Sequence, residues 1–452
     1  MKRKIYEKML AWKASANGKS ALMLDGARRV GKSYIAEEFA RNEYESYLLI
    51  DFAKVSRDVK GFFMDYLDDL DTFFLYLQGA YHVTLTPRKS VLIFDEVQRF
   101  PRAREAIKHL VADGRFDYIE TGSLISIQRN VKNILIPSEE HHLEMFPMDF
   151  EEFLWANGAD AVCEIIRSAY NGAHEIGDGM HRRIMGLLRE YLVVGGMPQA
   201  VAAFVNGKDL AGAEAAKRDI LTLYRSDIMK FGGASKHTIL SVFNALPSAL
   251  SRHEWRFRPG EIRKGSAFRS FEATFEWLKS SMTVNVAYNT TEPNVGLELT
   301  SDHTTLKCYM GDTGLLVSMA FSERELFDGG LGYRLISGKV EMNAGMLYEN
   351  LVAQMLRAAG HPLYFYTTSA AGDRAERMEI DFLLAKSQLQ RRHNIMPVEV
   401  KSSGEYATRS LDKFTAKFDN YLADACILHP KDVCHENGKV YLPLYMAHLI
   451  GL

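Results

Sequence analysis

Residues 21–34 of this 452-residue chain read ALMLDGARRVGKSY. A short apolar run is followed by Gly-x4-Gly-Lys-Ser at residues 26–33, and a helix-like run comes next. The two glycines permit a tight loop whose backbone N–H groups turn inward on an anion, and the N-terminus of the following helix adds its positive dipole end. In such a loop Lys32 reaches the β- and γ-phosphates, and the Ser33 hydroxyl binds Mg²⁺. The stretch therefore predicts a strand, a phosphate-binding loop and a helix.

Three further β-like runs follow in the first 150 residues, at 47–52, 90–96 and 116–122. Each is nearly continuously apolar, as expected of a strand that is covered on both faces. Helix-like stretches separate the runs, and this alternation predicts the parallel α/β sheet of a P-loop NTPase. Residues 61–78, with four aspartates and no Lys or Arg, have the apolar spacing of one amphipathic helix. Its acidic face is interpreted as solvated surface rather than as a metal site.

Polar residues end two of these runs. Asp95 and Glu96 follow the apolar run SVLIF, at the end of the strand where open α/β sheets bind ligands. Asp95 is expected to hold the metal through water, and Glu96 to act as the general base that polarises the attacking water. Alone, such a pair could be a helix N-cap, but its position after a P-loop favours an ATPase. Thr121 and Ser123 end the next run, where a hydroxyl could touch the γ-phosphate or the water.

Charge, cysteine content and hydropathy restrict the class of protein. The chain has 55 Lys and Arg against 57 Asp and Glu, which excludes a basic coat over the whole surface but not a local patch. Four cysteines are too few for a disulfide scaffold and indicate the reduced thiols of a cytoplasmic protein. The basic N-terminus lacks the apolar core of a signal peptide. The apolar stretch 191–207 is interrupted by two glycines and a proline, so no membrane segment is expected.

The remainder of the chain divides by pattern. Residues 150–235 are helical in pattern, and two more helical patterns with a β-ribbon in 236–325 are compatible with a winged helix. A strong helix at 345–360 opens a second α/β region with β-like runs, a helix and a further strand. The expected domains are an ATP-binding domain at 1–155, a helical and winged-helix region at 156–325, and a second α/β domain at 326–452.

Three motifs together resemble the AAA-superfamily ATPase domain of a large prokaryotic family: GARRVGKS at 26–33, LIFDEVQ at 92–98 and TGS at 121–123. FPMDFEEFL at 146–154, YLVVGGMP at 191–198 and YMGDTGLL at 309–316 are similar to that family too. The resemblance implies ATP and Mg²⁺ as cofactors and ATP hydrolysis as the activity. The residues expected at ATP are Gly26, Ala27, Arg28, Arg29, Val30, Gly31, Lys32, Ser33 and Tyr34, with Ser33 and Asp95 at Mg²⁺ and Lys32, Glu96, Thr121 and Ser123 in catalysis.

The source of an arginine for the phosphates stays open. The family often has a Gly-Arg pair before a proline-containing strand, where this chain has SEEHHLEMFP at 138–147. Arg129 is a weak substitute, and Arg28 and Arg29 could serve phosphate binding or partner contact. An arginine supplied by a second copy would make the protein a homo-oligomer, and no such residue can be assigned from the sequence.

The C-terminal region of that family is related to PD-(D/E)xK nucleases. Asp381 on one β-like run and Glu399-x-Lys401 on the next match this pattern, and alternation puts Glu399 and Lys401 on one face. The carboxylates could share a divalent cation and the lysine could activate a water. Glu349 is the fourth member by resemblance. Alone, Glu-x-Lys is common as a solvated pair, so cleavage activity is left open.

Two other segments carry chemistry-bearing residues. Residues 251–270 hold six Lys or Arg, with aromatics between them. They could bind DNA phosphates through Arg256, Arg258, Arg263 and Lys264, or form a solvated loop. Cys426, His429, Cys434 and His435 are too cramped for an ordinary zinc site, and a structural role is favoured.

Three functions follow from the sequence. One is an ATPase coupled to a DNA-related action, one a slow nucleotide-dependent switch with a vestigial nuclease-like domain, and one an ATP-regulated DNA nuclease.

Overall fold

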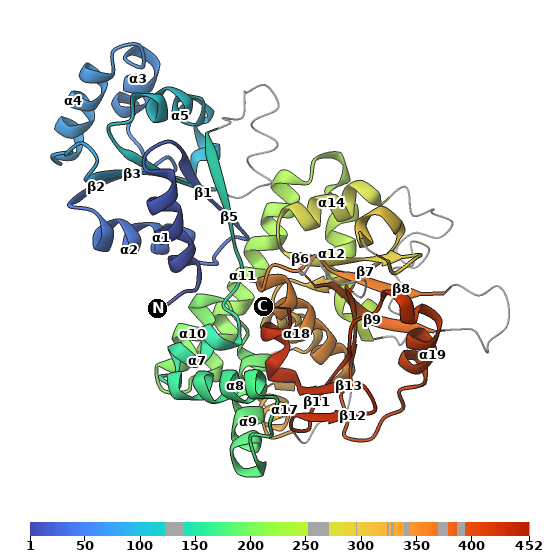
Figure 1. The fold of residues 1–452 in the computed structure, drawn as a ribbon. Coiled ribbons are helices and arrows are strands. Elements are labelled where there is room, and N and C mark those ends of the chain that lie inside the picture. The colour runs from blue at the N-terminus through green and yellow to red at the C-terminus, as the bar shows by residue number, and fades with distance from the viewer. Residues whose placement is uncertain are drawn as a thin grey trace. The chain divides into compact units, whose positions relative to one another are not determined.

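The computed structural model describes residues 1–122, 139–251, 271–294, 296–322, 325–326, 330–338, 344–368, 378–386 and 394–451. The chain forms two compact units, Met1–Phe146 and Pro147–Leu452, which are described separately (Figure 1). The expected boundaries at 155/156 and 325/326 stay predictions.

A five-stranded parallel sheet is the centre of the N-terminal unit. Its order is β2-β3-β4-β1-β5. The strands are β1 (Ala21–Gly26), β2 (Ser46–Asp51), β3 (Ser90–Asp95), β4 (Asp117–Gly122) and β5 (Glu140–Met145). The four strands expected from apolar runs are confirmed, and β5 adds an edge strand that the sequence did not predict. The parallel sheet with its helices has the P-loop NTPase fold.

Helices cover both faces of this sheet. Figure 1 shows α1 (Ile5–Ala16) and α2 (Lys32–Glu43) on one face, and α3 (Arg57–Asp65), α4 (Leu70–Tyr81) and α5 (Pro101–Asp113) on the other. Aromatic rings fill the second face; Phe63, for example, packs edge-on against Phe94 with ring centroids 5.6 Å apart. Such burial is the main driving force for closing the layers on the sheet.

The single helix expected over 61–78 is two helices, so that prediction is wrong. The helix α3 ends at Asp65, and α4 begins at Leu70. The Asp69 carboxylate accepts a hydrogen bond from the Thr72 N–H, which makes Asp69 an N-cap that starts a new helix. The acidic residues themselves are exposed, as the amphipathic pattern predicted.

The C-terminal unit begins with a helical layer. Its helices are α7 (Phe150–Ala156), α8 (Asp160–Gly172), α9 (Asp178–Val194), α10 (Pro198–Val205), α11 (Leu210–Phe231), α12 (Lys236–Ser251) and α14 (Glu272–Ser280). Three further helices follow later in the chain: α15 (Thr313–Ala320), α17 (Leu331–Ile336) and α18 (Ala344–Ala358). The helix α19 (Arg409–Phe418) comes last, between two strands of the sheet of this unit.

An eight-stranded mixed sheet completes this unit, in the order β12-β13-β11-β10-β9-β8-β6-β7. Its strands are β6 (Val284–Thr290), β7 (Ser301–Met310), β8 (Tyr364–Thr367), β9 (Glu379–Ala385), β10 (Ile395–Val400), β11 (Ala425–His429), β12 (Cys434–Glu436) and β13 (Lys439–Pro443). The strands β8, β9 and β10 are antiparallel neighbours, whereas β10 and β11 are parallel. The β6–β7 hairpin joins the sheet through parallel pairing of β6 with β8. The winged-helix assignment of this region therefore stays a prediction.

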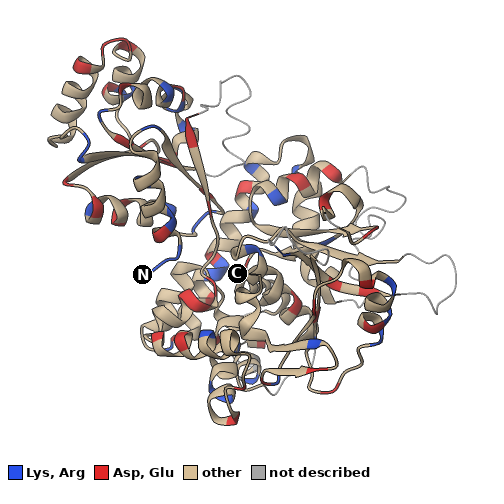
Figure 2. Cartoon of the chain, viewed as in Figure 1, with Lys and Arg blue, Asp and Glu red and all other residues tan. Residues whose placement is uncertain are grey.

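Charge is distributed over both units. Figure 2 shows basic and acidic residues interspersed along the helices of each unit, in keeping with the formal net charge of −2. Within the described residues, no helix has both the length and the apolar character needed to cross a membrane.

Candidate functional site

The phosphate-binding loop runs from the end of β1 to the start of α2, as expected. Gly31 has a φ of 98°, and Arg29 has a φ of 69°. Only glycine adopts such angles without strain, which explains Gly31 directly before α2. Gly26 is required for a different reason, since a Cβ at this position would lie 2.4 Å from the Met145 carbonyl oxygen of β5. Gly31 thus permits the turn into α2, and Gly26 permits the close approach of β1 to β5.

Lys32, the first residue of α2, folds back over the loop. Its ammonium donates hydrogen bonds to the carbonyl oxygens of Gly26 at 2.8 Å and Ala27 at 2.9 Å. Desolvation lowers the pKa of Lys32 to about 8, although the negative charges of Glu96, Asp25 and Asp95 act in the opposite direction. Among the described residues, the hydrogen-bond partners of the ammonium are carbonyl oxygens, so no directly bonded carboxylate neutralises its charge.

Asp95 joins the loop to the neighbouring strands. Its Oδ1 accepts a hydrogen bond of 2.6 Å from the Ser33 hydroxyl and another from the Thr121 hydroxyl of β4. Asp95 and Thr121 are both buried. The parallel register of β3 and β4 brings the ends of these strands together, because Phe94 pairs with Glu120. A carboxylate and a hydroxyl that both suit Mg²⁺ thus lie side by side.

Glu96 follows directly in a left-handed conformation, with a φ of 55°. A positive φ is uncommon for a residue other than glycine and is often found at functional sites. The Glu96 N–H donates to the Thr121 hydroxyl at 3.3 Å, and the Glu96 carboxylate accepts from the Gln98 side-chain amide at 2.7 Å. These contacts fix the direction of a carboxylate that remains partly exposed.

The other residues expected at ATP differ in burial. Ala27 and Val30 are buried, Arg28 is half-buried, and Arg29 and Tyr34 are exposed. Arg3, which the sequence did not single out, donates to the Val30 carbonyl at 2.9 Å and so supports the loop from outside. Ser123 and Arg129 lie outside the described residues.

A charged cluster beneath the loop was not foreseen. His142 of β5 contacts Asp25 Oδ2 at 2.6 Å and Glu140 Oε2 at 3.3 Å. Hydrogen bonds to Asp25 and then Glu140 raise the pKa of His142 to about 10, so the imidazole is positively charged at neutral pH. Arg104 of α5 binds both carboxylate oxygens of Glu140, at 3.1 and 2.7 Å. Burial, with the charge of Glu140, raises the pKa of Glu120 well above its usual range.

The four C-terminal candidates lie on the elements that the sequence predicted. Glu349 belongs to α18, Asp381 to β9 and Glu399 to β10, with Lys401 next after β10. The Asp381 carboxylate accepts from the Val400 N–H at 2.8 Å, and the Lys401 ammonium lies 2.5 Å from Glu399 Oε2. Burial raises the pKa of Glu349 to about 7 and that of Glu399 to about 7, although Lys307 and Lys401 respectively act in the opposite direction.

Lys307 is one of two residues of this site that the sequence did not single out. It lies on β7, is fully buried, and contacts Glu349 and Glu379. Glu379 was missed as well, although it stands two residues before Asp381 and therefore on the same face of β9. Within the run TTLKCYM the lysine has no local mark of its role, because its partners come from α18 and β9.

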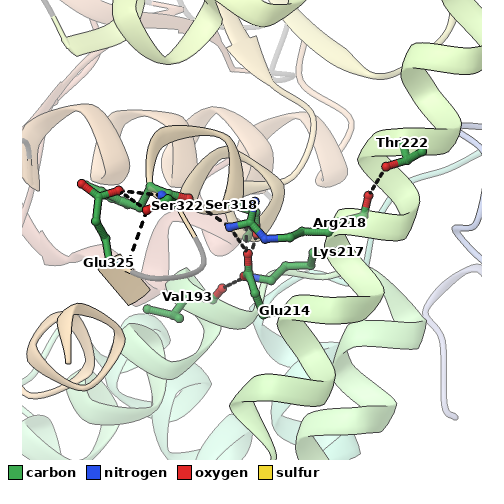
Figure 3. Close-up of polar contacts among 10 residues, drawn as sticks. Val193, Glu214, Lys217, Arg218, Thr222, Ser318, Ser322 and Glu325 are labelled. Atoms are coloured by element: carbon green, nitrogen blue, oxygen red, sulfur yellow. Dashed lines mark hydrogen bonds and ion pairs between the residues drawn. The ribbon is translucent and has the colours of Figure 1, made fainter. Parts of the chain in front are cut away.

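Buried charges also join three helices of the C-terminal unit, and Figure 3 shows this junction. Glu214 of α11 contacts Lys217 at 2.8 Å and accepts from the Ser318 hydroxyl of α15 at 2.8 Å. The Lys217 ammonium donates to the Val193 carbonyl in the last turn of α9 at 2.7 Å. The adjoining cavity, of about 10 Å³, holds no more than one water molecule. We therefore assign this junction to packing rather than to ligand binding.

The motifs at 191–198 and 309–316 meet at the same junction. The Gly196 N–H donates to the Asp312 carboxylate at 2.6 Å, and Asp312 caps α15. A Cβ at Gly314 would lie 2.4 Å from the Val194 carbonyl oxygen. Close backbone approach thus explains Gly195 and Gly314, which let the end of α9 lie against the start of α15, whereas a Cβ at Gly196 would meet the Met148 carbonyl oxygen.

The remaining candidate segments add little to a functional site among the residues that the structure describes. Arg256, Arg258, Arg263 and Lys264 lie outside the described residues. Cys426 is buried in β11. Both ring nitrogens of His429 have partners, the Tyr406 hydroxyl at 2.6 Å and the Asp432 carbonyl at 3.1 Å. These contacts support a structural role for Cys426 and His429, whereas Cys434 is exposed.

Comparison with known families agrees with the geometry of the N-terminal site. Residues 18–154 match the family model of an AAA domain (AAA_14). Residues 185–325 match a domain of unknown function (DUF8612), and residues 344–446 match another (DUF4143). No curated protein matches the chain. The N-terminal part is thus an AAA-type P-loop domain, whereas the model that matches the C-terminal residues carries no assigned activity.

Solved structures show distant likeness. The Walker-type ATPase PABY2304 of Pyrococcus abyssi is 15% identical, with a TM-score of 0.40, over 71% of this chain and 96% of that chain. The RuvB Holliday junction branch migration motor of Thermotoga maritima is 12% identical over 63% and 89%, with a TM-score of 0.29. The Aeropyrum pernix ORC1 protein in complex with DNA is 13% identical over 73% and 94%, with a TM-score of 0.25. TM-scores this low transfer no property to this chain.

Proposed function

We propose that this protein is a Mg²⁺-dependent ATPase. The observation that carries the proposal is the contact of the Ser33 hydroxyl with Asp95 Oδ1 at 2.6 Å, beside a lysine whose ammonium donates to the Gly26 and Ala27 carbonyls. Residues 62 positions apart in the chain meet here at the end of a parallel sheet, where such folds bind ligands. The loop amides and Lys32 suit a triphosphate, and Ser33 with Asp95 suits its metal.

Each residue then has a distinct role in hydrolysis. Lys32 leaves the Gly26 and Ala27 carbonyls for the β- and γ-phosphates and stabilises the charge that develops on them. Ser33 and Asp95 would hold Mg²⁺, which neutralises phosphate charge when bound. Glu96 takes the proton of the attacking water. Thr121 positions Asp95 and the Glu96 backbone through its hydroxyl, and Ser123 would occupy the sensor position beyond it.

Substitution of Glu96 by Gln tests this proposal. The variant should bind fluorescent ATP with nearly unchanged affinity but hydrolyse it about 100-fold or more slowly, because only the proton acceptor is lost. Glu45→Gln, at an exposed residue that precedes β2 and pairs with Lys89, is the matched control and should retain turnover. A purified wild-type protein that neither binds nor hydrolyses ATP would disprove the proposal.

We also infer that the C-terminal unit has a nuclease-like core and that ATP turnover serves a DNA-related action. Support comes from the order α18, antiparallel β8-β9-β10, α19 and then β11 parallel to β10, with Glu349, Asp381 and Glu399 on three of these elements. Arg256, Arg258, Arg263 and Lys264 are the proposed DNA contacts.

A slow nucleotide-dependent switch is the alternative. Turnover measured with and without duplex DNA separates the two functions, since stimulation of the rate by DNA favours a coupled ATPase and a constant slow rate favours a switch. An arginine from a second copy would add a dependence of turnover on protein concentration.

A further inference from the structure

A lysine ammonium lies among the C-terminal carboxylates. Lys307 Nζ is 3.1 Å from Glu349 Oε1, 3.0 Å from Glu379 Oε1 and 3.8 Å from Asp381 Oδ1. The side chain of Lys307 has no exposed surface. The centroid of the Phe365 ring lies 5.1 Å from the ammonium, near enough for a cation–π contact. Three carboxylates and an aromatic ring therefore surround this one cation.

These oxygens belong to α18 and β9, two elements that would present ligands to a metal in a nuclease-like core. Oxygen ligands lie about 2.0–2.1 Å from Mg²⁺ and about 2.3–2.6 Å from Ca²⁺. Around Lys307 the closest oxygens lie at 3.0 and 3.1 Å, which is the distance of a hydrogen bond to an ammonium. In the part of the chain that the structure describes, no group of three or more His, Cys, Asp and Glu side chains could hold a metal ion.

The charge balance also favours the lysine over a metal. The side chain of Lys307 has no exposed surface, and its ammonium lies within hydrogen-bond distance of the Glu349 and Glu379 carboxylates. Their negative charges compensate the charge of the buried ammonium. A divalent cation brought to the same carboxylates would lie within a few ångströms of it, where two positive charges repel strongly in a buried site.

We propose that Lys307 is the resident cation of this carboxylate site and takes the place of a divalent metal. The carboxylates of Glu349, Glu379 and Asp381 then fasten β7 to α18 and β9 instead of binding Mg²⁺ or Mn²⁺. Glu399 is paired with a different lysine, the partly exposed Lys401. At these carboxylates the wild-type chain accordingly binds no divalent metal, and this inference does not depend on the proposed ATPase.

Binding of Mn²⁺ alone to the full-length chain, followed by the electron paramagnetic resonance signal of free Mn²⁺, tests the proposal. Wild-type protein and the Asp381→Asn variant should give identical isotherms, because any weak binding near Ser33 and Asp95 is common to both. The Lys307→Met variant should bind about one additional Mn²⁺ per chain, since the freed carboxylates match the preference of this ion for oxygen. The double variant with Asp381→Asn should lose that additional ion.

Two results would overturn the proposal. One is Mn²⁺ binding by the wild-type chain that Asp381→Asn removes, and the other is a folded Lys307→Met variant that gains no Mn²⁺. Should Lys307→Met fail to fold, the wild-type and Asp381→Asn isotherms still decide, because a difference between them rejects the proposal and their identity supports it.

Discussion

Lys32 in the N-terminal unit and Lys307 in the C-terminal unit both have ammonium groups that contact other protein groups, but these partners differ in charge. The ammonium of Lys32 donates to two backbone carbonyls, at 2.8 and 2.9 Å. The ammonium of Lys307 contacts the carboxylates of Glu349 and Glu379, at 3.1 and 3.0 Å. Carbonyl dipoles orient a cation without neutralising it, whereas carboxylates neutralise it.

The difference appears in how easily each lysine loses its proton. The pKa of Lys32 falls to about 8 because of desolvation, so its charge is costly until an anion arrives. The pKa of Lys307 is raised because three carboxylates outweigh its burial. A lysine drawn into a protein is therefore a sign of ligand binding only when the charge around it is left uncompensated.

Replacing Lys32 by Met should give the largest effect. We expect ATP turnover to fall by about 10,000-fold, or ~5.5 kcal/mol in activation free energy, because the charge that stabilises the phosphates is lost. The free energy of unfolding should change by less than about 1 kcal/mol, since no carboxylate loses a direct partner. Steady-state phosphate release and urea unfolding measure the two quantities.

Lys8→Met, on the exposed face of α1, serves as the control and should leave turnover unchanged. Wild-type turnover in the Lys32→Met protein would contradict the assignment of Lys32 to ligand binding.

Replacing Lys307 by Met should give the opposite pattern. The C-terminal unit should lose about 3 to 4 kcal/mol of stability, because buried carboxylates remain without their cation. Hydrogen exchange of peptides from β7 and β9 would report this loss in the unit concerned. Lys401→Met, at a lysine whose side chain is 21% exposed, should cost less than about 1 kcal/mol. Equal costs for the two variants would mean that burial and multiple partners do not set the value of Lys307.

Most of the N-terminal site could be predicted from the sequence, because its residues follow apolar strands in a known pattern. Strands β1, β3 and β4 were evident as apolar runs, and their parallel pairing brings Ser33, Asp95 and Thr121 together. The strand β5 was not evident, since its sequence EHHLEM carries charges that local pattern assigns to a loop. Within this strand, Glu140 and His142 are paired with Arg104 and Asp25, which are distant in sequence.

The C-terminal site could be predicted only in part, because some of its contacts also join residues that are distant in sequence. Glu399-x-Lys401 and Asp381 stand in short apolar runs that predict strands, and the structure confirms those strands as β10 and β9. The environment of Lys307 depends on three carboxylates contributed by two other elements. No local pattern predicts such a contact, because the free energy of a buried charge depends on tertiary structure rather than on neighbouring residues.

A more moderate effect is expected for Ser33→Ala. This variant tests whether Asp95 can bind a metal, in contrast to the carboxylates around Lys307. Removal of the hydroxyl that contacts Asp95 should raise the Mg²⁺ concentration for half-maximal turnover by about 10- to 100-fold. Binding of ATP without Mg²⁺ should stay nearly the same, because Lys32 and the loop amides are intact. An unchanged Mg²⁺ requirement would argue against Ser33 as a ligand.

His142 is an intermediate case and should give the smallest effect. It contacts two carboxylates, Asp25 and Glu140, but 45% of its side chain is exposed. Hydrogen bonds to Asp25 and Glu140 raise its pKa from 6.5 to about 10, so the folded state binds the proton more tightly than the unfolded state. The resulting stabilisation is complete below pH 6.5 and is lost as the pH rises through about 10.

Exposure reduces this stabilisation to about 1 kcal/mol. His142→Gln should therefore be less stable than wild type by that amount at pH 6, and the gap should close by pH 10.5. Urea unfolding of both proteins across this range measures the gap, and the opposite slope that Lys32 contributes above pH 8 cancels in the difference. A gap that is independent of pH would show that His142 acts through packing, and the description of Lys307 as a cation held by carboxylate charge would then not extend to His142.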